Sequence, residues 1–99
     1  FKTRRDIMVD LLREIDGFKV NVPEGAFYVF PDVSAFFGKI IDGYQIENAG
    51  DFSMFLLEKA NVATVSGEAF GAANCIRLSY AASESQIREA IKRIKKVVS

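Results

Sequence analysis

The spacing between apolar residues changes along this sequence, and that change limits the folds that the chain can adopt. Near both ends, apolar residues recur every three or four positions, as they do on one face of an amphipathic helix. The central part instead holds short apolar runs bounded by glycine, proline, asparagine and aspartate, which is typical of strands and turns. The sequence therefore predicts an α+β layer in which helices pack on a small sheet.

Three helices are predicted. The first ends before Gly17, which suits the left-handed position after a helix. The middle helix is capped by Asp51 and ended by Asn61. The third opens with Ser83 and Gln86 at the spacing of a capping box. The apolar stripes of the first and third helices are formed by Ile7, Met8, Leu11, Leu12 and Ile15 and by Ile87, Ile91, Ile94 and Val98.

Two strands are predicted between the first and second helices. Residues 18–33 are interpreted as two extended segments around a turn at residues 23–25. The run AFYVF, residues 26–30, is apolar without alternation, which predicts a strand that is covered on both faces. Residues 34–39 are expected to form a single helical turn beneath Asp32 or Ser34, and residues 40–50 are interpreted as a loop.

Two further strands, at residues 62–67 and 75–80, are predicted between the second and third helices, with a glycine-rich connection between them. The predicted order is helix, two strands, helix, two strands, helix, which is an α+β arrangement. The helices are expected to lie on one side of a small, mostly antiparallel or mixed sheet.

The composition excludes several classes of protein. The chain has 99 residues, enough for one domain and too few for two, and its thirteen basic and thirteen acidic residues balance. No apolar run has the length of a membrane span, and a single cysteine cannot form an internal disulfide, so we expect a cytoplasmic protein without a membrane partner. Histidine is absent, so we expect no metal site.

The last predicted helix is strongly basic over residues 88–96. A nucleic-acid patch is one interpretation, but no aromatic residue lies among these bases to stack on nucleobases. A solvated helix face, whose cations complement the helix dipole, is favoured, and no nucleic-acid partner is expected.

Arg77 lies in the middle of the predicted strand NCIRLSYA and is the only arginine between Glu14 and Ile87. Alternation along a strand places Arg77 on the face opposite to Ile76 and Leu78. In one interpretation Arg77 forms an ordinary surface ion pair. In the other it is a carboxylate receptor, because a guanidinium on a rigid strand offers two parallel donors to the two oxygens of a carboxylate.

The remaining polar residues do not form a catalytic set. The lysines fall on predicted polar faces or helix ends, where none is expected to be a Schiff-base nucleophile. The acids Glu24, Asp32, Asp42 and Glu68 fall in turns, where such residues are ordinary, and a nucleophile, a base and an orienting group cannot be assembled from these residues. The glycine-rich stretch GEAFGAAN lacks the pattern of a phosphate-binding loop.

Three stretches carry a resemblance to a known family, and they occur in this order: RRDIMVDLLREIDGFKVNVPEGAFYVFPDVS, FLLEKANVATVSGEAFG and IRLSYAASESQIREAIKRI. Together they resemble the C-terminal small domain of the fold-type-I, pyridoxal-phosphate-dependent aminotransferases. Within that family the likeness is to the bacterial aspartate aminotransferases, and it covers essentially the whole chain.

The resemblance implies a role for Arg77. In the family, the arginine of the strand that looks like IRLSYA binds the α-carboxylate of the substrate. The family's PGxxFG turn corresponds to residues 66–71, where Ser66 stands in place of proline and leaves the stiffness of the turn open. By this resemblance Gly67, Phe70 and Gly71 either shape a wall near Arg77 or simply pack the turn.

The resemblance also implies an activity that this chain does not carry alone. Full-length members exchange an amino group between an amino acid such as aspartate and a 2-oxo acid, with pyridoxal phosphate as cofactor. The Schiff-base lysine and the phosphate-binding groups of the family belong to its large domain, and their motifs do not occur here. We therefore expect residues 1–99 to form one C-terminal small domain of a longer chain, inactive alone and without bound cofactor. Its expected partners are the large domain of the same chain and a second copy of the parent in a homodimer.

A second interpretation remains open from the residues themselves. The chain would then be a free-standing α+β module that binds a small acid or a protein partner, with Arg77 as the anion contact. An initiator methionine just before Phe1 would favour the module, whereas a long upstream reading frame with a Schiff-base lysine would favour the enzyme.

Overall fold

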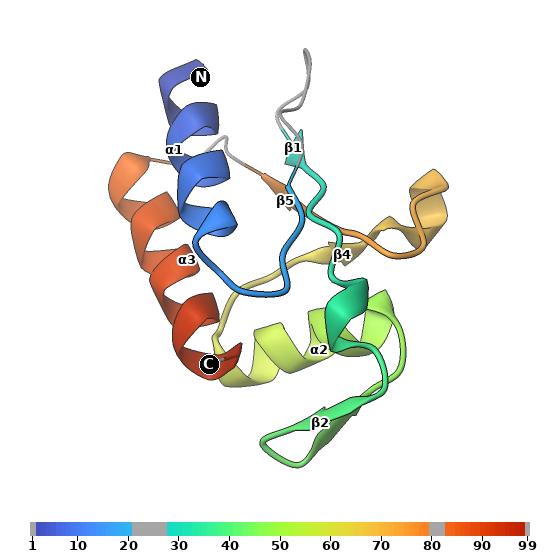
Figure 1. The fold of residues 1–99 in the computed structure, drawn as a ribbon. Helices are drawn as coiled ribbons and strands as arrows, with labels where there is room; N and C mark the ends of the chain where they lie inside the picture. The colour runs from blue at the N-terminus through green and yellow to red at the C-terminus, as the bar shows by residue number, and fades with distance from the viewer. Residues whose placement is uncertain (1, 21–27, 80–82, 99) are drawn as a thin grey trace.

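The computed structural model describes residues 2–20, 28–79 and 83–98, and the described elements follow the predicted α+β order (Figure 1). The helices are α1 (Lys2–Arg13), α2 (Ala49–Lys59) and α3 (Glu84–Val98), with short 3-10 helices η1 (Ser34–Phe36) and η2 (Gly67–Phe70). The strands are β1 (Tyr28–Val29), β2 (Lys39–Ile41), β3 (Tyr44–Ile46), β4 (Val65–Ser66) and β5 (Ile76–Ser79).

Strand β5 is the middle strand of the larger sheet, whose order is β1-β5-β4. Both pairings are antiparallel: Tyr28 lies opposite Ser79, and Val65 lies opposite Arg77. The isolated bridge from Asp32 to Cys75 continues the pairing of β1 with β5, and the bridge from Lys19 to Asp32 joins the segment after α1 to Asp32. The predicted antiparallel sheet is confirmed, and its central strand carries Arg77.

One face of this sheet packs on the helices. Val29, Ile76 and Leu78 are buried on that face and belong to the same core as the buried side chains of all three helices. Helices α1 and α3 lie side by side, and α2 runs beneath β4 (Figure 1). The prediction that the helices cover one side of the sheet is confirmed.

The opposite face of the sheet is open in the described part of the chain. Phe30 is 37% exposed and Val65 is 43% exposed, while Tyr28 and Arg77 are half-buried. The prediction that AFYVF is covered on both faces is therefore wrong for residues 28–30, because Phe30 is exposed and Tyr28 only half-buried on the outer face. Residues 26 and 27 of that run, and the predicted turn at residues 23–25, lie outside the described residues.

A cluster of phenylalanine rings joins η1, α2 and the segment after α1. The ring centroids of Phe36 and Phe52 are 4.9 Å apart in a stacked arrangement, and Phe18 meets both rings edge to face. Gly17 has a φ of +95°, and a Cβ atom built on it would lie 2.8 Å from the ring of Phe36. Glycine is thus needed after α1 both for its backbone conformation and for this close approach.

The stretch predicted as a loop at residues 40–50 contains a β-hairpin and the start of α2. Strands β2 and β3 pair in antiparallel register around a turn at Asp42 and Gly43, which have φ values of 51° and 84°. Positive φ at both turn residues is the geometry that matches the twist of a two-residue hairpin, and Asp-Gly is a common sequence for it. Tyr44 then packs on Phe55, with ring centroids 5.4 Å apart.

Helix α2 is capped by Asn48 rather than by Asp51. The Asn48 side chain accepts a hydrogen bond from the Asp51 backbone N–H at 2.8 Å, and the Asp51 carboxylate accepts one from the Glu47 backbone N–H at 3.1 Å. The two side chains thus cap the same helix end reciprocally. Asn61, which was predicted to end this helix, has a φ of 56°, as expected for a residue just beyond a helix C-terminus.

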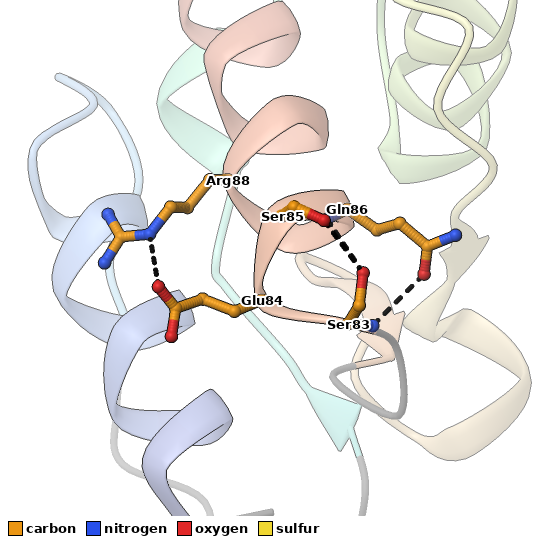
Figure 2. A network of polar contacts seen from close by, with 5 residues as sticks. All are labelled: Ser83, Glu84, Ser85, Gln86 and Arg88. Carbon is orange, nitrogen blue, oxygen red and sulfur yellow. Dashed lines mark hydrogen bonds and ion pairs between the residues drawn. The ribbon is translucent and has the colours of Figure 1, made fainter.

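The predicted capping box of α3 is confirmed (Figure 2). The Ser83 backbone N–H donates to the Gln86 side chain at 3.1 Å, and the Gln86 backbone N–H donates to the Ser83 hydroxyl at 3.2 Å. Ser83 also contacts the hydroxyl of Ser85 at 3.1 Å, and Glu84 pairs with Arg88 one turn later. These contacts fix the start of the helix that follows β5.

We expect Ser83→Ala to lower the free energy of unfolding by about 1 kcal/mol, since it removes the acceptor for one helix N–H group. Urea unfolding followed by circular dichroism measures this change. Ser85→Ala is the matched control, because its hydroxyl accepts no helix N–H bond in the capping box, and it is expected to change stability by less than about 0.5 kcal/mol. Equal effects of the two substitutions would contradict the capping role of Ser83.

Candidate functional site

The backbone of Arg77 is fixed by the strands on either side of β5 and by the two buried residues next to it in the chain. Its chain neighbours Ile76 and Leu78 are buried in the core, and β1 and β4 flank the strand. The side chain points to the open face and is half-buried. The Arg77 guanidinium is therefore attached to a rigid part of the fold.

Aromatic and apolar side chains surround Arg77 on the open face. The guanidinium carbon Cζ lies 4.3 Å from the centre of the Tyr28 ring, within the range of a cation–π contact. Val65 lies directly opposite Arg77 on β4, and the pairing between β1 and β5 places Phe30 opposite it on the other side. Because Arg77 is half-buried, a hydrogen bond between its guanidinium and an anion is stronger here than at a fully exposed arginine.

The turn after β4 is tied to β5 close to Arg77. The Gly67 backbone N–H donates to the Cys75 carbonyl at 2.7 Å, and the Ala72 N–H donates to the Gly67 carbonyl at 2.8 Å. A Cβ atom on Gly67 would lie 2.4 Å from the Ala72 carbonyl oxygen, so only glycine fits there. Gly71 follows η2 with a φ of +78°, where glycine is also favoured.

Ser66 has a role in this turn that proline lacks. Its hydroxyl accepts a hydrogen bond from the Glu68 backbone N–H at 3.2 Å and so caps η2. Gly67 and Gly71 lie in the turn next to β5, as the family resemblance implies, and their part in a site wall stays a prediction. Phe70 ends η2, and its side chain lies outside the described residues.

Cys75, two residues before Arg77, is not an activated nucleophile. Partial burial raises the pKa of its thiol, and the nearby charge of Asp32 raises it further. Hydrogen bonding to the Ser34 side chain lowers the pKa of Asp32, and the Ser34 backbone N–H, which donates to the Asp32 carboxylate at 2.8 Å, lowers it further. Asp32 therefore binds the first N–H of η1, but the N-cap of η1 is Val33 without a side-chain cap bond, so the predicted cap at Asp32 or Ser34 is not confirmed.

The described lysines do not fit a seat for pyridoxal phosphate. Every lysine whose side chain the structure describes is exposed. Lys59 lies 2.9 Å from the Asp42 carboxylate, whose hydrogen bond raises the Lys59 pKa, so Lys59 stays protonated and cannot act as an amine nucleophile. Residues 2–20, 28–79 and 83–98 also contain no cluster of three or more metal-ligating side chains, and none of their helices is long and apolar enough to cross a membrane.

A surface hollow of about 680 Å³ lies on another part of the molecule, between α3 and the segment after α2. It is lined by Asn61, Val62, Ala63, Ser85, Gln86, Glu89, Ala90 and Arg93. The residues around Arg77 do not line this hollow, so the hollow is not part of the Arg77 site.

Comparisons with known proteins agree with the resemblance seen in the sequence. The sequence model for aminotransferases of class I and II matches residues 1–94. A probable aspartate/prephenate aminotransferase of Aquifex aeolicus is 51% identical over 98 residues, which are 99% of this chain and 23% of that protein. A bifunctional aspartate aminotransferase and glutamate/aspartate-prephenate aminotransferase of Petunia hybrida is 48% identical over 99 residues, 21% of its length.

Solved structures show the same fold. The crystal structure of the aspartate aminotransferase from Rhizobium meliloti superposes with a TM-score of 0.93 at 44% identity and covers 97% of this chain and 24% of that one. The aspartate aminotransferase from Thermus thermophilus with maleate gives a TM-score of 0.80 at 36% identity, over 97% of this chain and 22% of that one. The chain thus spans about a fifth to a quarter of the length of these relatives, and it belongs to the class I and II aminotransferase family.

Proposed function

We propose that this chain is the C-terminal small domain of a pyridoxal-phosphate-dependent aminotransferase and that Arg77 binds the α-carboxylate of its substrate. The full-length enzyme exchanges an amino group between an amino acid, such as aspartate, and a 2-oxo acid. The names of the relatives, which include aspartate and aspartate/prephenate aminotransferases, support this substrate class. The domain alone is inactive, because none of the lysines whose side chains the structure describes is suited to hold the cofactor.

The observation that carries this proposal is the position of Arg77. Its guanidinium lies on the open face of the sheet, between Tyr28 and Val65, and its backbone belongs to the central strand. A guanidinium presents parallel N–H donors that match the two oxygens of a carboxylate. An interaction of this kind fixes both the position and the orientation of a bound amino acid.

Orientation is the contribution that these residues make to the reaction. When Arg77 binds the α-carboxylate, the substrate can no longer translate or tumble freely, and only rotation about the bond to its Cα atom remains. This restriction makes it easier to orient the Cα–H bond toward the cofactor. Pyridoxal phosphate, bound by the large domain, supplies the electron sink. Phe30 and Val65 are exposed in this domain, and once the large domain covers them water is excluded beside the guanidinium, which strengthens its hold on the carboxylate.

The open face of the sheet is also the side on which we place the large domain of the same chain. Phe30 and Val65 are large apolar side chains that are exposed there, and covering them removes apolar surface from water. A substrate bound to Arg77 would then lie between the two domains. We further propose a homodimer for the parent and a cytoplasmic location, the latter because its small domain has a single cysteine and hence no internal disulfide.

The activity is tested on the full-length protein. Purified with pyridoxal phosphate and given aspartate and 2-oxoglutarate, it is expected to form oxaloacetate, which a coupled dehydrogenase assay detects. Residues 1–99 alone, with the same cofactor and substrates, are expected to form none. A full-length protein that binds the cofactor but accepts no amino donor would contradict the proposal, and so would activity of residues 1–99 alone.

A further inference from the structure

We propose that Tyr28 is a positioning residue for the Arg77 guanidinium, an inference that rests on the function proposed above. Its ring forms a platform that holds the guanidinium on the open face before the substrate arrives. In this way Tyr28 strengthens binding of the α-carboxylate without touching the carboxylate itself.

The contact joins two strands. Tyr28 lies opposite Ser79 in the pairing of β1 with β5, so its ring reaches Arg77 along the diagonal between neighbouring strands. Aromatic and long side chains interact at this diagonal spacing. The Cζ atom of Arg77 lies 4.3 Å from the ring centre, compared with 5.8 Å for Lys59 over Tyr44 and 6.0 Å for Lys39 over Phe36.

Burial makes the contact with Tyr28 more effective than an exposed one. Both Tyr28 and Arg77 are half-buried, whereas Lys39 and Lys59 are exposed. The attraction between a cation and a ring grows when water is excluded from the pair. Val65 and Phe30 flank Arg77 on either side, and the large domain proposed to cover these exposed side chains would complete the exclusion of water.

An aromatic platform also leaves the binding chemistry of arginine intact. A guanidinium has five N–H donors in one plane, and the contact of its carbon atom with the Tyr28 ring uses none of them as a hydrogen-bond donor to an oxygen. A flexible arginine loses rotational freedom when it binds a carboxylate, and a side chain that is already held loses less. The Tyr28 ring therefore reduces the entropy lost on binding, and its effect must pass through Arg77.

The experiment is a double-mutant cycle in the full-length enzyme, with Tyr28→Leu and Arg77→Ala made singly and together. Tyr28→Leu is expected to lower kcat/KM for aspartate about 3- to 30-fold, mainly through a higher KM, as for loss of a partly desolvated cation–π contact. In the Arg77→Ala background the same change is expected to have no further effect beyond about two-fold, because the two side chains act as one unit.

Two further variants separate positioning from mere packing. Tyr28→Phe keeps the ring and is expected to retain kcat/KM within about two-fold. Tyr44→Leu removes another ring that lies near a cation, but in the β2–β3 hairpin, and is the matched control, expected to leave kcat/KM unchanged. The melting temperature of each variant is measured as well, so that a loss of stability is distinguished from a loss of kcat/KM.

Each outcome is decisive. Equal losses from Tyr28→Leu in both backgrounds, or failure of Tyr28→Phe to retain activity, would overturn the positioning role. A large loss from Arg77→Ala with no loss from Tyr28→Leu would reject only this inference. An Arg77→Ala enzyme with undiminished kcat/KM would instead reject the proposed function of Arg77 itself.

Discussion

In the full-length enzyme, Arg77→Ala is expected to lower kcat/KM for aspartate by about 30- to 5,000-fold, which corresponds to ~2–5 kcal/mol of lost binding to the transition state. The loss is large because the substrate carboxylate would enter the site beside Tyr28 and Val65, covered by the proposed large domain, without its cationic partner. Steady-state kinetics over a range of aspartate concentrations measures the change. A loss of less than about three-fold would contradict the role of Arg77.

Two companion variants sharpen this test. Arg77→Lys keeps the positive charge but loses the pair of parallel donors, so its kcat/KM is expected to fall between those of the wild type and Arg77→Ala. Arg88→Ala removes an exposed arginine that pairs with Glu84 on α3, and it is expected to leave kcat/KM within about two-fold. If the arginine variants at positions 77 and 88 behaved alike, the effect would come from overall charge and not from the site.

The second large effect is expected from Phe52→Ala, which should lower the free energy of unfolding by about 3–5 kcal/mol. The Phe52 side chain is fully buried, stacks on Phe36 and meets Phe18 edge to face. Its removal leaves a cavity where α2, η1 and the segment after α1 meet, and the surrounding rings cannot fill it fully. Urea unfolding followed by circular dichroism gives the change in stability.

Met54 provides the control for this substitution. It lies on the same helix, but 54% of its side chain is exposed, so Met54→Ala is expected to change stability by less than about 0.5 kcal/mol. A cost below about 1 kcal/mol for Phe52→Ala would show that the phenylalanine cluster is not the centre of the core.

The sequence predicted those parts of the fold whose signals are local. The stripe of α3 and its capping box at Ser83 and Gln86 lie within a few residues of each other, and both are confirmed. Gly17 and Asn61 were placed at helix ends by backbone preference alone, and both have positive φ in the structure. Such features depend little on the rest of the chain, so they can be predicted without knowledge of the fold.

Other parts were missed for physical reasons. The hairpin of β2 and β3 has a local signal in Asp42-Gly43, but its strands have three residues each and β2 is mostly exposed, so the apolar pattern around the turn is weak. The exposure of Phe30 depends on what covers the outer face, which the run AFYVF does not encode. The cap that Ser66 provides to η2 was also not predicted, because the family pattern has proline at this position and proline has no side chain that can cap a helix.

In the candidate site, too, local features were predicted and features that depend on distant parts of the chain were not. Alternation along the strand placed Arg77 on the face opposite to Ile76 and Leu78, and the structure agrees. The carboxylate role came from the family resemblance, since a lone arginine on a strand is compatible with a surface ion pair. The contact with Tyr28 could not be predicted, because it depends on the pairing register between β1 and β5.

The most direct measurement is a crystal structure of the full-length enzyme with a dicarboxylate substrate analogue bound. The account predicts two parallel hydrogen bonds of about 2.7–2.9 Å from the Arg77 guanidinium to one carboxylate, with the Tyr28 ring still against the guanidinium. A structure in which the analogue is bound elsewhere, while Arg77 is hydrated on the outer surface of the enzyme, would contradict it.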